Sequence, residues 1–308
     1  MKISIVTTLY KSSSYIDEFY LRVSAAARNL TDDYEIVLVN DGSPDDSLLR
    51  AIQLTRSDNR IVLIDLSRNF GHHKAMMTGL SYVRGERIFL IDSDLEEDPG
   101  WLLIFSEHMD RENCDVVYGV QERRKGGFFE KWSGELFYRF FKHLTGLTLP
   151  QNIVTARLMT KQYVDALLLH DEREVFLAGL WHITGFDQRP LNINKKNTSE
   201  TTYTFQHKMS LLVNSVTSFS NAPLKAIFYI GIIISLLACG YTTYLVINKF
   251  FFAKPLSGWT SVMASIWILG GAIIIFIGII GIYLSKIFME TKRRPYTIIR
   301  QIYGKKPN

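Results

Sequence analysis

The residues best suited to chemistry form an acidic run directly after an apolar stretch. Ile88 to Ile91 is apolar, and the next seven residues, 92–98, contain five carboxylates. A short β-branched and aromatic run bounded by polar residues is typical of a buried strand. Crowded carboxylates repel one another unless a cation lies among them, and Mg²⁺ or Mn²⁺ prefers oxygen ligands. Asp92 and Asp94, two residues apart, predict such a metal site, the alternative being a solvated acidic turn.

Strand and helix patterns alternate around this run. We predict strands at Ile3–Leu9, Tyr34–Asn40, Ile61–Leu66, Ile88–Ile91 and Val116–Val120. Helices are predicted between them, at Ser14–Leu30, Ser47–Arg56, His72–Arg84 and Trp101–Glu112. This alternation favours an α/β fold with a parallel sheet covered by helices.

Polar residues follow four of the predicted strands. They are Thr8-Leu9-Tyr10, Asp41-Gly42-Ser43, Arg68-Asn69-Phe70-Gly71 and Asp92-Ser93-Asp94. Ligands of open α/β sheets bind beyond the carboxyl ends of the strands. We therefore expect these residues to meet at one edge of the sheet and to form one ligand site.

Two long apolar segments follow. Ala226–Asn248 and Trp259–Ser285 each exceed the roughly 20 residues that cross a bilayer. They predict two transmembrane helices within 225–288, with a buried helical hairpin as the alternative. Basic residues flank the pair at Lys225 and throughout 289–308, which places the N-terminal domain and the tail in the cytoplasm.

Two amphipathic helices are also predicted. Residues 128–144 interleave aromatic and basic side chains, as helices at a membrane interface do, although packing on the domain is the alternative. Residues 207–224 would form a juxtamembrane helix. The predicted organisation is a cytoplasmic domain at 1–206, this helix, two membrane helices at 225–288 and a basic cytoplasmic tail at 289–308.

Composition excludes two classes of protein. The 308-residue chain has a formal net charge of +5, which we attribute to membrane-facing residues because no nucleic-acid-binding motif is present. Cys114 and Cys239 have no metal-binding spacing and predict no disulfide, which fits a reducing compartment. Neither a nucleic-acid-binding protein nor a disulfide scaffold is expected.

The order of the polar motifs resembles that of a known family. Ile5–Tyr10, Val39–Ser43, Arg68–Gly71 and Asp92–Leu95 are similar to the successive motifs of family 2 glycosyltransferases. The apolar segments and the run from Tyr203 to Leu224 resemble the membrane-bound polyprenyl-phosphate branch, with its bactoprenol glucosyltransferases and dolichyl-phosphate mannose synthases. The resemblance implies a GT-A (Rossmann-like) fold and an inverting, metal-dependent hexosyltransferase of class EC 2.4.1.-.

The resemblance also implies roles for individual residues. Asp92, Asp94 and Glu96 would bind Mg²⁺ or Mn²⁺, and Asp92, Asp94 and Arg157 would serve catalysis. The donor would be a nucleotide-sugar, with a UDP-sugar favoured over guanosine or thymidine donors. Its binding residues would be Thr8, Leu9, Tyr10, Asp41, Asn69, Gly71, Lys74, Asp92 and Ser93.

One departure from the family pattern bears on the acceptor. The usual Gly-Asp-Phe-Arg is here Val154-Thr155-Ala156-Arg157, which keeps the arginine and lacks the acid. A hydroxyl acceptor needs a general base, whereas a lipid phosphate is already an anion and needs positive charge to position it. We therefore predict that Arg124, Lys131 and Arg157 bind an acceptor phosphate.

Other charged residues have simpler interpretations. His72, His73 and Lys74 begin a predicted helix, where contact with a donor phosphate is one interpretation. A shared metal role is disfavoured for the histidines because adjacent side chains point apart on a helix. Glu97 and Asp98 are interpreted as helix N-terminal charges.

Three functions fit the sequence. The first is sugar transfer to polyprenyl (undecaprenyl) phosphate at a bacterial inner membrane, supplying O-antigen, lipopolysaccharide or another envelope glycan. The second is transfer to a hydroxyl of a lipid-linked saccharide, with Glu96, Glu97 or Asp98 as base. The third is a silent membrane scaffold that binds sugar nucleotides, which the retained Asp41 and Asp94 disfavour. The resemblance also suggests a homo-oligomer, a tetramer.

Overall fold

A computed structural model describes residues 2–121, 152–194, 216–217, 220–252 and 258–304. Its Cα positions divide the chain into two units. The first unit contains the described residues 2–121 and 152–194 together with 294–304. The second contains the described residues between 216 and 293. Each unit is described by itself below.

The described part of the first unit is built on an eight-stranded mixed sheet in the order β7-β5-β6-β4-β1-β2-β3-β8. The strands are β1 (Ile3–Leu9), β2 (Tyr34–Asn40), β3 (Ile61–Leu66), β4 (Arg87–Leu90), β5 (Val116–Gln121), β6 (Ile153–Thr160), β7 (Gln188–Ile193) and β8 (Ile299–Gly304). Strands β4, β1, β2 and β3 are parallel neighbours, as predicted. Strands β6 and β8 run antiparallel to the strands beside them. The predicted α/β class is confirmed, but the sheet is mixed and not wholly parallel.

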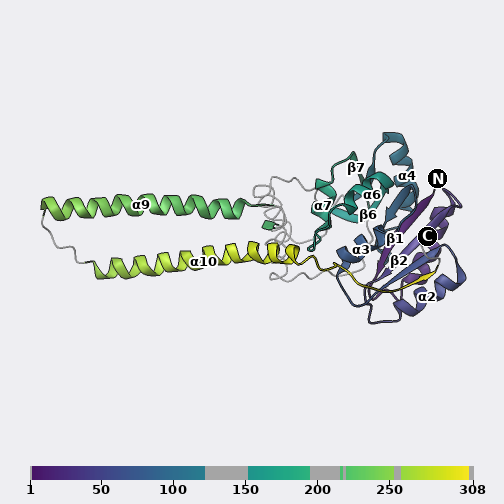
Figure 1. Cartoon of the computed structure of the whole chain (residues 1–308). Coiled ribbons are helices and arrows are strands. Elements are labelled where there is room, and N and C mark those ends of the chain that lie inside the picture. Colours follow the sequence, from purple (N-terminus) through teal and green to yellow (C-terminus); the bar gives the residue numbers. More distant parts are fainter. Residues whose placement is uncertain (1, 122–151, 195–215, 218–219, 253–257, 305–308) are drawn as a thin grey trace. The chain divides into compact units, whose positions relative to one another are not determined.

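Helices cover both faces of this sheet (Figure 1). They are α1 (Ile16–Arg28), α2 (Ser47–Ser57), α3 (His72–Leu80), α4 (Trp101–Glu112), α6 (Lys161–Leu168) and α7 (Leu177–Ile183). Because successive strand side chains point to opposite faces, Ile5 joins the core under α1 and α4 whereas Val6 faces α3. The helices on each face therefore bury one side of the same central strands.

A glycine brings α3 close to the sheet. A Cβ atom on Gly79 would lie 2.6 Å from Val6 Cγ1 and 2.9 Å from Val39 Cγ2. The helix ends at Leu80, short of the predicted Arg84. The N–H of Arg84 donates instead to Glu35 Oε1 at 2.7 Å, so buried side chains at the start of the sheet end the helix.

Strand β8 was not predicted from the sequence. It lies within the residues interpreted as a basic tail and pairs antiparallel with β3. The pairing joins Val62 to Gly304 and Ile64 to Ile302. The end of the chain therefore completes one edge of the sheet.

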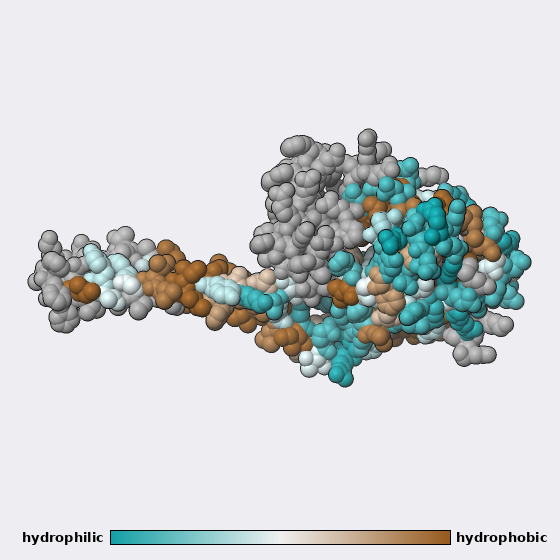
Figure 2. All heavy atoms as spheres, turned by 90° about the horizontal axis from the view of Figure 1, so that it is seen from above, coloured by the Kyte–Doolittle hydropathy of each residue, from teal (hydrophilic) through white to brown (hydrophobic). Residues whose placement is uncertain are grey.

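The second unit contains two long helices that lie side by side, α9 (Ala222–Phe252) and α10 (Trp259–Thr291). The Tyr283 hydroxyl donates to the Ser220 carbonyl at 2.6 Å. Among the described residues, one stretch, Ser265–Thr291 of 27 residues, is long and apolar enough to cross a membrane. Its apolar side chains are exposed, with Trp267 at 79% and Ile274 at 73% (Figure 2). The second predicted span is therefore supported, and the first, although α9 covers it, stays a prediction.

An ion pair between the buried Asp58 carboxylate and the partly exposed Arg60 stabilises the turn between α2 and β3. Asp58 accepts hydrogen bonds from the Arg60 backbone, from its guanidinium at 2.8 Å and from the Tyr20 hydroxyl at 2.9 Å. Burial by itself raises the pKa of Asp58, but the bonds from Arg60 and Tyr20 outweigh it and lower the pKa to about 2. The ionised form of Asp58 is therefore more stable in the folded chain than in the unfolded chain.

We expect Asp58→Asn to destabilise the protein by about 2 kcal/mol at pH 7. Because the folded pKa lies below the unfolded value of 3.8, this stability is present above that value and is lost as the pH falls towards 2. Denaturant unfolding of the detergent-solubilised chain should show the difference at pH 7 and a smaller one at pH 3. An equal difference at both pH values would contradict the assignment.

Candidate active site

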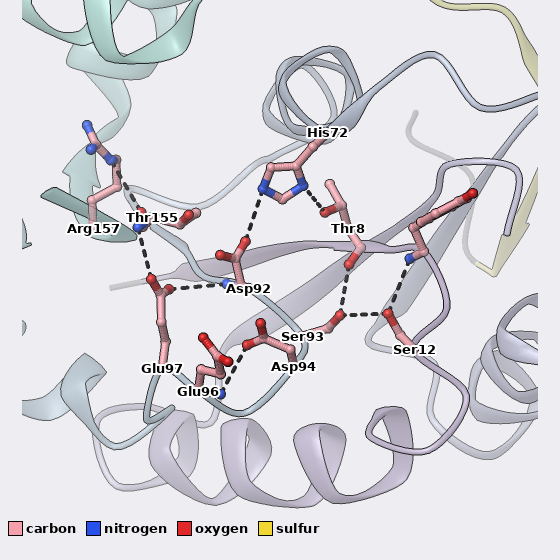
Figure 3. Close-up of polar contacts among 11 residues, drawn as sticks. Thr8, Ser12, His72, Asp92, Ser93, Asp94, Glu96, Glu97, Thr155 and Arg157 are labelled. Atoms are coloured by element: carbon pink, nitrogen blue, oxygen red, sulfur yellow. Dashed lines mark hydrogen bonds and ion pairs between the residues drawn. The ribbon is translucent and has the colours of Figure 1, made fainter. Parts of the chain in front are cut away.

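The four polar motifs meet at the carboxyl edge of the parallel strands, as predicted. In β1, β2 and β4, parallel register aligns Val6 with Val37 and with Leu90. The next strand, β3, continues the same direction beside β2. The segments that follow β1, β2, β3 and β4 therefore leave the sheet together, and Figure 3 shows residues of β1 and of the loop after β4 in contact.

Ser93 joins the loop after β4 to the end of β1. Its hydroxyl donates to the Thr8 carbonyl at 2.9 Å and lies 3.0 Å from the Ser12 hydroxyl. Ser12 in turn receives the N–H of Tyr10 at 3.2 Å. Ser93 and Ser12 are buried, whereas Tyr10 is 48% exposed. Ser93 thus fixes the loop, and Tyr10 is a side chain at this strand end that is open to a ligand.

His72 connects the first helical turn of α3 to the end of β1 and to the loop after β4 (Figure 3). Its Nδ1 lies 2.9 Å from Thr8 Oγ1, and its Nε2 lies 3.2 Å from Asp92 Oδ1. Burial lowers the pKa of His72, but the contact with Asp92 and the charges of Asp41 and Asp94 raise it above 6.5 overall. His72 is therefore an additional candidate site residue, which the sequence indicated only through its place at a helix start.

Asp94 and Glu96 lie on a tight turn beside Asp92. The N–H of Glu96 donates to Asp94 Oδ1 at 3.0 Å, and Leu95 between them has a positive φ of 61°. Figure 3 shows the carboxylates of Asp94 and Glu96 close together, while the Asp92 side chain is directed towards His72. Three carboxylates are an oxygen donor set of the kind that Mg²⁺ and Mn²⁺ bind. In the described residues, no three acidic, histidine or cysteine side chains are already arranged around one metal position.

Glu97 is a buried structural residue of the site. Its Oε1 accepts from the Thr155 N–H at 2.9 Å, and its Oε2 accepts from the Asp92 N–H at 3.4 Å. The residue has no exposed surface. Its interpretation as a helix N-terminal charge is wrong, because it joins the backbone of the acidic loop to β6.

Asp41 holds the loop after β3. Its Oδ1 accepts from the Phe70 N–H at 2.7 Å and its Oδ2 from the Gly71 N–H at 3.0 Å. Gly42 allows this approach, since a Cβ atom there would lie 2.4 Å from the Asn69 nitrogen. Asp41 is 2% exposed, whereas Asn69 is exposed. Asp41 shapes the loop directly, and a contact between Asp41 and a base stays a prediction.

Arg157 of β6 is 1% exposed. Its guanidinium lies over the Trp181 ring, and its Nε donates to the Thr155 carbonyl at 3.4 Å. Burial lowers its pKa, and the negative charge of Glu97 counteracts part of that shift. Figure 3 shows the guanidinium directed away from Asp94. The structure therefore buries Arg157 behind the acidic loop, and its predicted role in binding phosphate requires a rearrangement.

The other predicted residues divide into three groups. The Leu9 side chain is buried in the core, and its carbonyl accepts from the Asp41 N–H at 3.0 Å. Lys74 lies in the first turn of α3, close in sequence to His72. Arg124, Lys131 and the predicted interface helix at 128–144 lie outside the described residues.

Comparisons with known proteins show which family the chain belongs to. The sequence profile described as "Glycosyl transferase family 2" matches residues 4–168. A Mycobacterium tuberculosis protein whose name places it among glycosyltransferases is 52% identical over 99% of this chain and 89% of its own. A Shigella flexneri protein named SfII prophage-derived bactoprenol glucosyl transferase is 29% identical over the full length of both chains.

A solved structure was also found. Glucosyl-3-phosphoglycerate synthase from M. tuberculosis, in complex with Mn²⁺, UDP and glucosyl-3-phosphoglycerate, is 18% identical with a TM-score of 0.46. The match covers 70% of this chain and 77% of that one. The profile match spans more than half of the chain and includes the four strand ends that form the candidate site. The chain therefore belongs to glycosyltransferase family 2, and it is a sugar-transferring enzyme.

Proposed function

We propose that this enzyme transfers a sugar, with inversion, from a UDP-sugar to polyprenyl phosphate at the cytoplasmic face of a bacterial inner membrane. The observation that carries the proposal is the meeting of four strand ends, one of which leads into the Asp92–Asp94 loop, at one edge of the sheet. The names of full-length relatives support a bactoprenol-type acceptor. The product would be a lipid-linked sugar for an envelope glycan.

The donor would bind across the ends of β1, β2 and β3. Tyr10 and Asn69 are exposed there, and Asp41 and Ser93 fix the backbone around them. Asp92, Asp94 and Glu96 would hold Mg²⁺ or Mn²⁺, which would offset the charge that develops on the departing diphosphate. His72 contacts Thr8 and Asp92 and so lies at the same end of the sheet.

The contacts of Glu97 and Asp98 disfavour two of the three carboxylates that could serve as a base for a hydroxyl acceptor. Glu97 is buried and receives two backbone N–H groups. Asp98 is ion-paired with Arg22 at 3.0 Å and accepts from the Gly100 N–H at 2.9 Å. Both carboxylates are thus engaged in structural contacts that a general base would have to break. An anionic lipid phosphate attacks without such a base.

The apolar helix at 265–291 supports attachment to a membrane. We propose that α9 spans the bilayer as well, so that residues 1–206 and the C-terminal residues both lie in the cytoplasm. Lys286, Lys292 and Arg294, near the end of α10, supply the positive charge that the cytoplasmic side favours. The enzyme would then meet a lipid acceptor and a soluble donor at the same surface.

The test uses membranes that contain the full chain. They are incubated with a set of nucleotide-sugars, Mg²⁺ or Mn²⁺ and short-chain polyprenyl phosphate, and the lipid product is identified by mass. We expect metal-dependent release of nucleoside diphosphate and a glycosyl phosphate lipid. A product only with a lipid-linked saccharide would instead support hydroxyl transfer, and nucleotide binding without any product would support a scaffold.

Arg157→Ala tests the acceptor role in that assay. We expect the KM for polyprenyl phosphate to rise roughly tenfold or more, because a guanidinium–phosphate contact is charge-assisted. The donor KM should stay near the wild-type value. Arg189→Ala is the control for loss of an arginine charge outside the site, since Arg189 is an exposed arginine on β7 paired with Asp187. Unchanged acceptor kinetics in a folded Arg157→Ala protein would remove Arg157 from the acceptor site.

A further inference from the structure

The C-terminal segment Thr297–Arg300 binds the loop that leads into α3. We call Ser67–Gly71 the donor loop, because it contains Asn69 and Gly71. The Ser67 N–H donates to the Ile298 carbonyl at 2.8 Å, and the Ser67 carbonyl accepts from Arg300 Nη2 at 2.6 Å. Both backbone polar groups at the start of the donor loop are therefore bonded to the end of the chain.

A β-bulge places Arg300 for this contact. In the β3–β8 pair, Asp65 lies opposite Gln301, but Leu66 lies opposite Ile299, and the register shifts between them. Arg300 is thus the extra residue of β8 and has no partner on β3. A bulge of this kind re-aims the side chain of the extra residue. Here the guanidinium is directed back across the end of β3 and reaches the donor loop.

Arg300 also reaches the neighbouring strand through Asp65. Arg300 Nη1 lies 3.4 Å from Asp65 Oδ2, and Asp65 Oδ1 accepts from Asn40 Nδ2 at 2.8 Å. Asp65 is 1% exposed, so its carboxylate is buried. The Arg300 side chain that contacts this carboxylate is exposed. Asn40 directly precedes Asp41, which holds the other end of the donor loop through Phe70 and Gly71. One set of contacts therefore connects both ends of the loop.

A second contact joins the same segment to α3. The hydroxyls of Thr297 and Thr78 lie 2.8 Å apart, and the Thr78 hydroxyl donates to the Lys74 carbonyl at 2.9 Å. The segment thus touches the donor loop and the helix that follows it. Asn69, in the middle of the loop, is exposed. Its backbone nitrogen lies so close to Gly42 that a Cβ atom at position 42 would be only 2.4 Å from it.

We propose that Arg300 is a positioning residue for the nucleotide-sugar. By bonding Ser67 and Asp65 together, it fixes the donor loop so that Asn69 is presented to the nucleotide in one conformation. This inference rests on the proposed function, because the donor loop is assigned to nucleotide-sugar binding there. It adds a residue more than 220 positions away in the sequence to the determinants of donor affinity.

The test compares Arg300→Ala, Arg300→Lys and Arg50→Ala in the detergent-solubilised full chain. Arg50 of α2 is the control, because it is similarly exposed and bonds Asp17 of α1. We expect Arg300→Ala to raise the donor KM by about tenfold while kcat at saturating donor changes less than about twofold. Amide hydrogen exchange in residues 68–71 should become faster. Arg300→Lys should recover part of the affinity, since an ammonium has no planar fork to span both acceptors.

The outcomes are distinguishable. If the wild-type chain turns over UDP-sugars and Arg300→Ala keeps its donor KM and its exchange pattern, the positioning role is overturned while the proposed function stands. An equal fall of kcat in all variants, or a rise in KM for Arg50→Ala as well, would also overturn it. If no nucleotide-sugar is turned over by the wild type, both proposals fail. Should Arg300→Ala fail to fold, Arg300→Lys carries the comparison.

Discussion

Asp94→Ala is expected to lower turnover roughly a thousandfold while leaving the chain folded and inserted in the membrane. Asp94 is partly exposed, and its carboxylate accepts the turn bond from the Glu96 N–H at 3.0 Å. Loss of one such bond costs about 1 kcal/mol of stability. Loss of a ligand to a catalytic cation would remove stabilisation of the leaving diphosphate. The measurement is nucleoside diphosphate release at saturating donor and acceptor.

Asp98→Asn is the control for this prediction. Asp98 belongs to the same acidic run, but its carboxylate is bound to Arg22 and to the Gly100 N–H. We expect this variant to retain most of its activity. Chelation should inactivate the wild type, and added Mg²⁺ or Mn²⁺ should restore it. A fully active Asp94→Ala enzyme would exclude Asp94 as an essential ligand.

Glu97→Gln is expected to destabilise the protein by about 2–4 kcal/mol. The buried carboxylate accepts from two N–H groups, those of Asp92 and Thr155. A glutamine has one acceptor oxygen, so its amide nitrogen would face one of these donors. The substitution also removes the negative charge that counteracts the effect of burial on the pKa of Arg157. Because the Asp92 backbone is released, kcat should fall together with stability.

The free energy of unfolding in denaturant is the direct measurement. Glu112→Gln is the matched control, since Glu112 lies on the surface beside Arg111. Loss of the Glu112 charge should lower the free energy of unfolding by less than about 1 kcal/mol. Wild-type stability in Glu97→Gln would mean that the carboxylate is not required to hold the acidic loop against β6.

The sequence predicted the strands that carry the site because their apolar periodicity is local. Strands β1, β2 and β3 have the predicted bounds, and the parallel pairing of β1 with β2 and β4 brought the motifs to one edge. The antiparallel strands were not predicted, since nothing within β6 or β8 indicates its partner. That information resides in contacts between distant segments, such as Val62 with Gly304.

Individual roles at the site were harder to predict for the same reason. Asp94 and Glu97 stand in one acidic run with similar flanking residues, yet one is partly exposed and the other has no exposed surface. The difference depends on Thr155, which is 58 residues away from Glu97. Arg157 was predicted to bind phosphate from its motif alone, whereas in the structure it is buried, with its guanidinium over the Trp181 ring.

The antiparallel pairing of β8 with β3 has a consequence for biosynthesis. Residues 299–304 are synthesised after both long helices, so the outer side of β3 stays uncovered in the nascent chain until this segment has emerged. An uncovered strand edge is a template for unwanted association with other chains. Synthesis of the two long helices therefore precedes completion of the sheet, and a chain shortened before residue 299 would leave the edge of β3 open to such association.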